Sequence, residues 1–400
     1  MMQQGKVLSQ DGQKKKEFGV ILSVVGISFI QGLQYAASPV LGAISAHYPQ
    51  VGVGTVQMLL TVPGILAIAV ALLSGRLVTK VSKKQLLITA GLLAGITGFL
   101  PFLSDSFTLL FVSRVLYGIP LGLATALNSA VVAEFFTGEK RTRVMGIQAA
   151  SVGAGIAVVT SVSGMLGAVD FHTSYFINII GFISFAVILL CLPETGKVVV
   201  TESEPIRLNR TVFIVALFGF LEFFFLMTFT TNIAMHLSGK LAGSSAASGW
   251  ITGVFSAAQI AVGLVLGNVT KLTKKMTLPA AMLCFCAGGV ILILFSGNLP
   301  MLMAGAVLCG FSQGIFLPTA YVDETSAVNP ASASMASAVF TSATCLGQLL
   351  SPTCTNAAAS ALLGSASTTH VYTVAAVGMA LSAVALTVWK NRENAGHAAD

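Results

Sequence analysis

Charged residues are scarce along this chain of 400 residues, and their scarcity excludes a large class of folds. Asp, Glu, Lys and Arg together make up 9% of the sequence, and apolar residues make up 55%. A typical soluble domain carries about 25% charged residues, because its surface faces water. The composition therefore excludes a soluble protein and indicates one whose surface faces lipid.

The chain also lacks the residue groups on which most enzymes and metal sites depend. Its apolar segments hold no cluster of His, Asp or Glu, and no glycine-rich phosphate loop is present. The six cysteines lie in apolar segments without a histidine cluster nearby, which is typical of reduced, buried side chains. We therefore expect no enzymatic activity, no cofactor, no metal site and no disulfide framework.

Long apolar segments, in contrast, are abundant. A helix needs about 17–25 predominantly apolar residues to cross a bilayer, and twelve such segments are separated by short polar loops. They cover residues 18–46, 54–74, 86–103, 107–133, 144–167, 173–192, 211–235, 248–270, 276–297, 301–322, 335–360 and 371–389. This pattern predicts an all-α polytopic membrane protein with twelve transmembrane helices.

Two short motifs recur half a chain apart. TKVSKK at 79–84 is answered 191 residues later by TKLTKK at 270–275, and VLYGIPLG at 115–122 is answered 192 residues later by VLCGFSQG at 307–314. The first pair follows the second and eighth apolar segments, and the second pair lies within the fourth and tenth. A shared offset indicates a duplicated unit. We therefore predict two pseudo-symmetric six-helix bundles.

The basic residues predict the orientation of these helices. Nearly all of the 21 Lys and Arg residues fall in segments on one side of the predicted membrane. Cytoplasmic loops carry such an excess, so we place both termini in the cytoplasm, in a multi-pass protein of the cell membrane. The net charge of +7 then reflects topology and attraction to anionic lipid, and no nucleic-acid partner is needed to explain it.

The longest polar segment divides the chain into two halves. The predicted units are a cytoplasmic N-terminal tail (1–17), an N-terminal six-helix bundle (18–192), a cytoplasmic central loop (193–210), a C-terminal six-helix bundle (211–389) and a cytoplasmic C-terminal tail (390–400). No segment is large enough for a separate soluble domain. We expect the chain to act as a monomer.

This architecture resembles the major facilitator superfamily, whose members consist of two halves related by an axis along the membrane normal. In that family the loop after the second helix reads Gly-x-x-x-Asp-basic-x-Gly-basic-basic. The same register here holds Gly75, Thr79, Lys80, Ser82, Lys83 and Lys84. Thr79 and Ser82 replace the family's Asp and second Gly, so the chain departs from the family's cytoplasmic charge latch.

A substitute for the missing acidic residue is present in the loop between the fourth and fifth helices. Glu134 precedes Arg141 and Arg143 there, in an arrangement common in the family. The resemblance implies a latch that forms through Glu134 instead. The alternative interpretation is that Lys83 and Lys84 only set the topology of the helices.

The fourth helix resembles that of proton-coupled members of the family. Arg114, Gly118 and Gly122 follow their Arg-x-x-x-Gly-x-x-x-Gly register. The fifth helix has several glycines but lacks the proline of the signature that exporters share. The resemblance therefore supports coupling to protons and leaves the direction of transport open.

Two charged residues stand inside predicted helices. Glu222 is central in the helix at 211–235, and Arg114 lies nearer the external end of the helix at 107–133. A charge at mid-membrane costs about 2.5–3.5 kcal/mol, so each is expected to face a partner or water. We predict that Glu222 carries the transported proton and that Arg114 assists it or binds an anionic group. The alternatives are a structural hydrogen bond for Glu222 and contact with the interface for Arg114.

Polar and aromatic side chains at helical spacing indicate where a substrate would bind. The first helix places its glutamines and a tyrosine on one broad face, and phenylalanines beside Glu222 would suit a lipophilic cation. The predicted substrate-binding residues are Gln31, Gln34, Tyr35, Asn128, Phe218, Phe225, Gln259 and Gln313. Such glutamines also join helices, and such phenylalanines also pack against lipid, so both interpretations stay open.

Three functions compete. The first is a proton-coupled secondary transporter that exports amphipathic or drug-like organic molecules in exchange for protons. The second is an uptake symporter or uniporter for a small polar solute such as a sugar, nucleoside or organic anion. The third, a non-transporting sensor or membrane enzyme, is disfavoured because no signalling domain or catalytic cluster is present. The expected partners are a small-molecule substrate, protons and the lipid bilayer.

Overall fold

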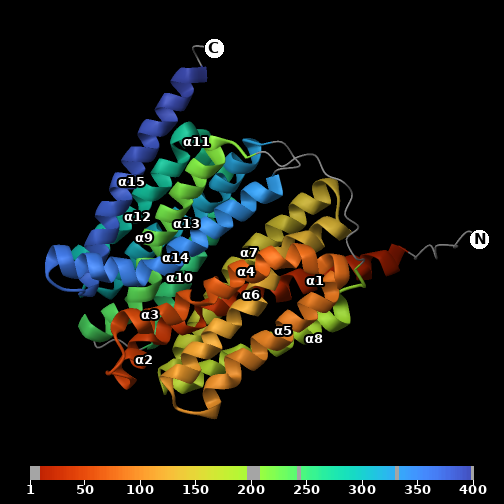
Figure 1. Ribbon diagram of the computed structural model, residues 1–400, viewed down its shortest axis with the longest axis horizontal. Helices are drawn as coiled ribbons and strands as arrows, with labels where there is room; N and C mark the ends of the chain where they lie inside the picture. Colours follow the sequence, from red (N-terminus) through yellow and green to blue (C-terminus); the bar gives the residue numbers. More distant parts are fainter. Residues whose placement is uncertain (1–9, 196–207, 241–244, 329–332, 398–400) are drawn as a thin grey trace, which may run out of the picture.

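Long helices make up nearly all of the computed structural model, which describes residues 10–195, 208–240, 245–328 and 333–397 (Figure 1). The N-terminal half consists of α1 (Gln10–Gly32), η1 (Leu33–Val40), α2 (Leu41–His47), α3 (Val53–Thr61), α4 (Pro63–Lys80), α5 (Lys83–Phe99), η2 (Leu100–Leu103), α6 (Phe107–Phe135), α7 (Gly138–Gly167), η3 (Phe171–Asn178) and α8 (Ile179–Cys191). The C-terminal half consists of α9 (Arg210–Lys240), α10 (Ser245–Leu264), α11 (Leu266–Thr273), η4 (Lys274–Met276), α12 (Thr277–Leu294), α13 (Leu299–Ser326), α14 (Ala333–Leu363) and α15 (Thr368–His397).

Eleven helical segments of the described chain are long and apolar enough to cross a bilayer. The twelfth is α14, whose sequence is rich in Ser and Thr and therefore less apolar. Several membrane segments consist of two or three helical pieces, such as α1, η1 and α2 together. The prediction of an all-helical membrane protein with twelve helices in two six-helix halves is confirmed.

Proline explains where the first two membrane segments are broken. Pro39 lies inside the 3₁₀ helix η1, and Pro63 begins α4 directly after α3. A proline has no backbone N–H, so it leaves a carbonyl of the preceding turn without its helical donor. These breaks leave backbone groups inside the membrane that side chains must satisfy.

Helix boundaries differ from the hydropathy pattern at several places, of which three are the clearest. α1 begins at Gln10 and not at 18, and α15 continues to His397 and not to 389. The predicted helix at 248–270 is two helices that meet at Val265, where α10 ends and α11 begins. Hydropathy marks the lipid-embedded part of a helix, whereas a polar extension in water keeps the same backbone hydrogen bonds. Most of the predicted central loop, 196–207, lies outside the described residues.

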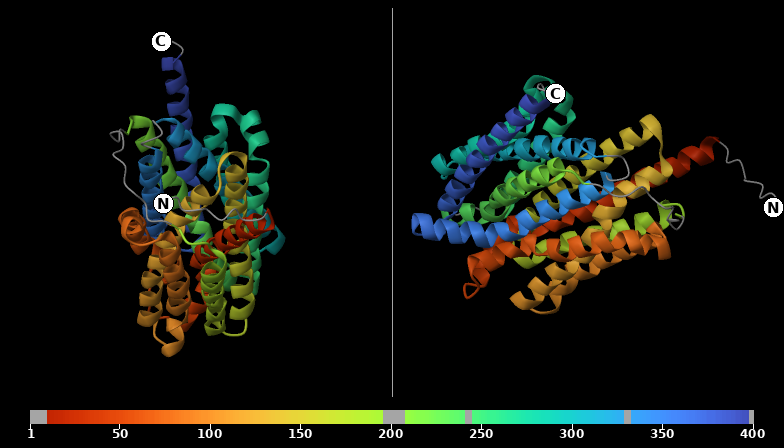
Figure 2. Two further views of the ribbon diagram at one scale, coloured as in Figure 1. Left: turned by 90° about the vertical axis from the view of Figure 1, so that its right-hand side faces the viewer. Right: turned by 45° about the horizontal axis from the view of Figure 1, so that its top comes forward.

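Each half has its own apolar core. One cluster of buried residues runs from Val20 to Leu192, entirely in the N-terminal half, and another runs from Val215 to Leu386, entirely in the C-terminal half. A third cluster, around Ile44 and Tyr48, includes Ala234 of α9 and so joins the two halves. The halves are therefore separately packed units that meet at this third cluster and along α7 and α10, and both views of Figure 2 show them as two groups of helices.

The duplication seen in the sequence reappears as matched contacts. A Cβ at Gly118 would meet the carbonyl oxygen of Pro63, and a Cβ at Gly310 would meet that of Phe255. Gly122 and Gly314 stand in the same relation to the carbonyl oxygens of Ala67 and Gln259. Each residue of the second set lies 192 positions after its counterpart in the first. The glycines are required here because only they let α6 approach α4, and α13 approach α10, this closely.

The two halves touch at one end of the molecule and part toward the other. We call the end that carries His47, Asp105 and His172 the histidine end, and the end that carries Lys83 and Lys390 the basic end. The ribbons of the halves spread apart toward the chain termini, at the basic end (Figure 1).

Contacts between α7 and α10 show the same divergence in detail. A Cβ at Gly164 would meet Gly249, and one at Gly153 would meet the side chain of Ile260. The next pair in this antiparallel register, nearer the basic end, is Gly146 and Gly267, and a Cβ at either would meet nothing within 4 Å. α7 and the α10–α11 segment therefore pack together near the histidine end and diverge toward the basic end.

Candidate functional site

Glu222 of α9 is fully buried inside the C-terminal half. Its Oε1 accepts a hydrogen bond of 2.6 Å from Ser312 Oγ of α13, and its Oε2 has no hydrogen-bond partner among the described residues. The thiol of Cys309, also on α13, is among its neighbours. The carboxyl group therefore has one firm hydrogen bond and one oxygen available for a proton.

Arg114 is bound to the backbone of its own half. Its Nε donates to the carbonyl oxygen of Leu59 at 3.0 Å, and an Nη donates to that of Gln34. Leu59 is the residue whose helical hydrogen bond Pro63 cannot make, so Arg114 supplies the missing donor. The guanidinium carbon also lies 5.0 Å from the ring centre of Tyr117. Arg114 thus holds the broken ends of two membrane segments in place.

The structure does not bring Arg114 and Glu222 together. They belong to different halves, and each has its own set of partners. Their shared isolation in the sequence therefore does not reflect contact between them. A break caused by proline offers a different reason for a buried arginine.

Polar side chains of the first membrane segment contact both halves of the molecule. Gln31 Nε2 donates to the carbonyl oxygen of Ala124 at 3.1 Å, within the N-terminal half. Gln34 Nε2 lies 3.5 Å from Oε1 of Gln348 on α14, across the boundary between the halves. Tyr35 is close to Cys345, one turn earlier on α14. Gln34 Nε2 is also 3.5 Å from the Leu60 carbonyl oxygen, so Gln34 lies at the boundary, Tyr35 faces the opposite half and Gln31 faces its own.

The other predicted substrate-binding residues lie within the separate halves. Asn128 Nδ2 donates to Ser28 Oγ at 3.0 Å, which joins α6 to α1. Gln259 is half-buried on α10, and Gln313 is buried on α13. The hydrogen bond of Asn128 agrees with a role in joining helices, whereas Gln259 Oε1 is buried without a hydrogen-bond partner among the described residues.

Phe218 and Phe225 belong to the packing of the C-terminal half. Phe218 is buried in the apolar core, and the Phe225 ring fills the space beside Gly378 of α15. Neither arrangement forms an aromatic box around Glu222. Phe220 and Phe224, whose rings stack at 5.7 Å, lie on another face of α9.

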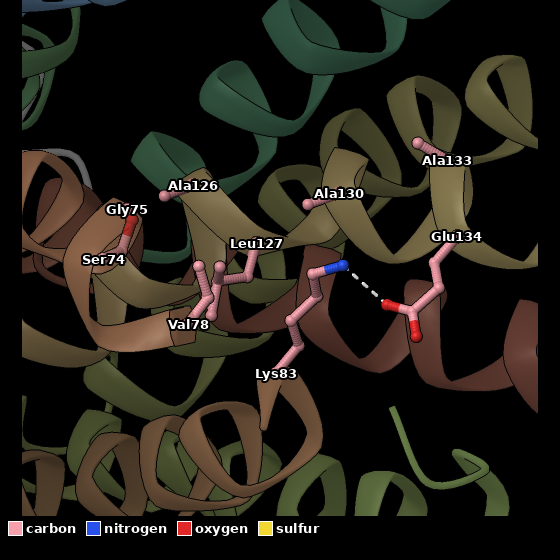
Figure 3. Close-up of a pocket in the computed structure, with 9 residues that line it drawn as sticks. All are labelled: Ser74, Gly75, Val78, Lys83, Ala126, Leu127, Ala130, Ala133 and Glu134. Atoms are coloured by element: carbon pink, nitrogen blue, oxygen red, sulfur yellow. Dashed lines mark hydrogen bonds and ion pairs between the residues drawn. The ribbon is translucent and has the colours of Figure 1, made fainter. Parts of the chain in front are cut away.

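The basic loop after α4 lies beside a cavity of about 460 Å³ at the basic end. Lys83 Nζ lies 2.6 Å from Glu134 Oε2 across this cavity, as Figure 3 shows. The cavity is lined by Ser74, Gly75, Val78, Lys83, Ala126, Leu127, Ala130, Ala133 and Glu134. Glu134 thus forms an ion pair with Lys83 of the basic loop.

The remaining basic residues of this region have different surroundings. Lys84 Nζ lies 3.4 Å from Glu194 Oε1, and its backbone N–H donates to Thr195. The predicted motif residues Lys80, Arg141 and Arg143 are exposed. Such exposure is typical of residues that set topology.

A polar cluster that the sequence did not single out joins the halves at the histidine end. Gln57 of α3 is fully buried. Its Nε2 donates to Asn232 Oδ1 on α9 at 2.7 Å, and its Oε1 accepts from Asn356 Nδ2 on α14 at 2.7 Å. Ser38 Oγ adds a hydrogen bond of 2.8 Å to the Thr230 carbonyl oxygen. We call Gln57, Asn232 and Asn356 the amide lock.

Two further groups were missed because the sequence placed them in loops. Glu324, beyond the predicted end of the tenth helix, is fully buried within α13 near Ser337. At the histidine end, His47, Asp105 and His172 meet although they lie in three separate connections. The pKa of Asp105 is lowered to about 2, mainly because Tyr48 donates a hydrogen bond to it and His47 lies beside it. No sequence spacing signals this cluster, since its members are far apart along the chain.

Comparison with known proteins identifies the architecture. The family model described as Major Facilitator Superfamily matches residues 23–227 and 215–400. No curated protein matches the sequence.

Three solved structures illustrate the similarity of fold. The nucleoside transporter NupG is 15% identical, with a TM-score of 0.75 over 92% of this chain and 99% of that one. The POT family transporter PepTSo is 9% identical, with a TM-score of 0.76 over 94% and 98%. A bacterial homologue of the human lysosomal transporter Spinster, inward-facing and unoccupied, is 14% identical, with a TM-score of 0.69 over 94% and 95%. At these identities the likeness concerns the fold and not the substrate.

Proposed function

This chain belongs to the major facilitator superfamily, and we propose that it is a proton-coupled secondary transporter that exports small amphipathic molecules, with Glu222 as the proton carrier. The family consists of transporters of small molecules and not of enzymes. The observation that carries the proposal is the buried carboxyl group of Glu222, which has a single hydroxyl donor.

The surroundings of Glu222 favour a cycle in which it gains and loses a proton. An ionised carboxylate inside a membrane protein costs several kcal/mol unless donors or cations surround it. Ser312 supplies one donor, and Oε2 has none from the described side chains. Glu222 therefore carries a proton in this conformation. It releases the proton when movement of α9 against α13 admits water or a cationic substrate.

The contact between the halves supports alternating access by rocking. The halves have separate cores and meet at the amide lock, so they move as two bodies once the lock breaks. We place the basic end in the cytoplasm, following the positive-inside rule. This conformation is then open to the cytoplasm, and the amide lock closes its external side. Lys83 and Glu134 form the charge pair that replaces the family's acidic residue in the cytoplasmic loop.

The substrate is proposed to bind where residues of both halves meet at mid-depth. Gln34 and Tyr35 from the N-terminal half and Cys345 and Gln348 from α14 supply neutral polar groups there. Of the substrate contacts predicted from sequence, we retain Gln34 and Tyr35, because Gln34 lies at the boundary between the halves and Tyr35 faces the opposite half. Neutral amide and phenol groups suit a molecule with a polar part and an apolar body.

Proton flux in sealed vesicles tests this function. Organic cations, anions and neutral solutes are added singly to vesicles that contain the parent, Glu222→Gln or the control Glu17→Gln, whose carboxylate pairs with Lys140 at the surface. We expect a cation to drive proton release in the parent and in Glu17→Gln but not in Glu222→Gln. Equal substrate-driven proton flux in all three proteins would remove Glu222 from the coupling mechanism.

A second candidate function is uptake of a small neutral solute. The paired amides of Gln34 and Gln348 favour it, because they present donors and acceptors from both halves at one level. In the same assay, this function predicts solute movement that is unchanged in Glu222→Gln and reduced at least ten-fold in Gln34→Leu. A matched Gln148→Leu variant, in which the lost amide bonds Ser129 within the N-terminal half, separates site effects from structural ones.

A further inference from the structure

Three connections of the N-terminal half converge on one point at the histidine end. His47 ends α2, Asp105 lies between η2 and α6, and His172 lies in η3. His47 Nε2 is 2.9 Å from Asp105 Oδ2, and His172 Nε2 is 3.4 Å from Asp105 Oδ1. One nitrogen or oxygen from each residue lies within 4.8 Å of those from the others. Their side chains are 28–54% exposed, so an ion reaches them directly from solvent.

We propose that His47, Asp105 and His172 bind a divalent transition-metal ion, with Zn²⁺ as the preferred ion. Two imidazole nitrogens and one carboxylate oxygen form a donor set that Zn²⁺ favours, and three protein ligands leave a fourth position for water. Asp105 Oδ1 lies 3.1 Å from His47 Nε2 and 3.4 Å from His172 Nε2, which are spacings of the size expected for neighbouring ligands at about 2.0–2.2 Å from one ion.

The groups around the three ligands hold them in position for an ion. His172 Nδ1 lies 3.0 Å from Asp170 Oδ1, a contact that keeps the proton on Nδ1 and leaves Nε2 free to bind a metal. Tyr48 donates a hydrogen bond to Asp105. The ring of Phe171 lies 5.0 Å from the ring of His47 and 3.9 Å from that of His172. A carboxylate behind a metal-binding histidine is a common feature of metal sites in proteins.

A bound ion would fasten the three connections of the N-terminal half to one another. α2, which supplies His47, also packs against α9 of the other half. The ion therefore stabilises the part of the N-terminal half that meets the C-terminal half at the closed end. This site lies apart from Glu222 and from the amide lock, and it does not depend on the proposed transport function.

Metal titration of the purified full-length protein tests the proposal. The protein in detergent is stripped with EDTA, transferred to metal-free buffer and titrated with Zn²⁺ by calorimetry and with Co²⁺ by visible absorption. We expect one ion per chain, a Co²⁺ spectrum with nitrogen and oxygen ligands in low coordination, and a higher melting temperature with Zn²⁺. His47→Asn and His172→Asn should each weaken Zn²⁺ binding at least ten-fold.

Two further variants separate a built site from incidental histidine binding. Asp170→Asn keeps the backbone contact at the start of η3 but weakens the support of His172, and it should reduce affinity about 10- to 100-fold. His370→Asn removes a half-buried histidine at the start of α15, outside the cluster, and should leave binding unchanged. Zn²⁺ binding that is equal in the parent and in His47→Asn/His172→Asn, or that falls with His370→Asn alone, overturns the proposal.

Discussion

The two halves of this transporter place different chemistry at equivalent helix contacts. In the N-terminal half, Arg114 of α6 donates to backbone carbonyls of the first two membrane segments. In the C-terminal half, α13 is the counterpart of α6, and there Ser312 donates to Glu222 of α9. The position 192 residues after Arg114 is Ala306, so the arginine has no copy. The duplicated scaffold is shared, but one half uses its charge to hold backbone and the other keeps a carboxyl group available for a proton.

Replacing each charge in turn should separate these two roles most clearly. Arg114→Met leaves the carbonyl oxygens of Leu59 and Gln34 without their donor, which should lower the free energy of unfolding by about 2–5 kcal/mol. The amide that Glu222→Gln introduces still accepts a hydrogen bond from Ser312. This variant should therefore lower the free energy of unfolding by less than about 1 kcal/mol. Thermal unfolding in detergent measures both. If both variants lowered the free energy of unfolding to a similar extent, Arg114 and Glu222 would not differ in their structural roles.

Substitutions of the repeated glycines test whether equivalent helix contacts in the two halves contribute equally to stability. Gly118→Val and Gly310→Val each push a side chain into a backbone carbonyl of the neighbouring helix. We expect both to lower the free energy of unfolding by about 1–3 kcal/mol and to similar extents. Gly146→Val is the control, because nothing lies within 4 Å of its added Cβ. A large decrease in the free energy of unfolding for only one of the two variants would show that the matched contacts contribute differently to stability.

Weakening the amide lock should reveal the independence of the halves. Gln57→Leu removes the hydrogen bonds to Asn232 and Asn356, each worth about 0.5–1.5 kcal/mol. Opening at the histidine end should then become about 5- to 100-fold more frequent, and amide hydrogen exchange over 53–61 should accelerate accordingly. Ser38→Ala, which removes one hydrogen bond to α9, should produce a smaller change in the same direction. Unchanged exchange in Gln57→Leu would mean that apolar contacts alone close this end.

The smallest effects should come from the ion pairs at the basic end, and they should be alike in the two halves. Lys83 pairs with Glu134 and Lys390 pairs with Asp323, both at 2.6 Å and both partly exposed. Lys83→Gln and Lys390→Gln should each lower the free energy of unfolding by less than about 1 kcal/mol. The loss should shrink at high salt, because salt screens exposed charges. A salt-independent loss in either variant would indicate that packing, and not charge, was disturbed.

Sequence patterns predicted some of the contacts described above and missed others for identifiable reasons. The sequence placed Glu134 and the loop at 79–84 on the same side of the membrane, and in the structure Glu134 pairs with Lys83 of that loop. The partners of Arg114 were not predicted. They are backbone carbonyl groups, that of Leu59 left without a helical donor by Pro63 and that of Gln34 in the 3₁₀ helix η1, and every residue carries a carbonyl group. A proline in a membrane segment opposite a buried arginine is the signal to look for.

The sequence by itself determined that this chain forms twelve membrane helices in two duplicated halves. Those features follow from local hydropathy and from a repeat, which need no knowledge of how the helices pack. Only the tertiary structure decided that Glu222 faces Ser312, that Gln57 bridges the halves, and that His47, Asp105 and His172 converge. Such contacts depend on the rotation of each helix about its axis and on the meeting of distant loops. In a uniformly apolar chain the amphipathic pattern that would reveal these rotations is weak, because lipid and protein interior attract the same side chains.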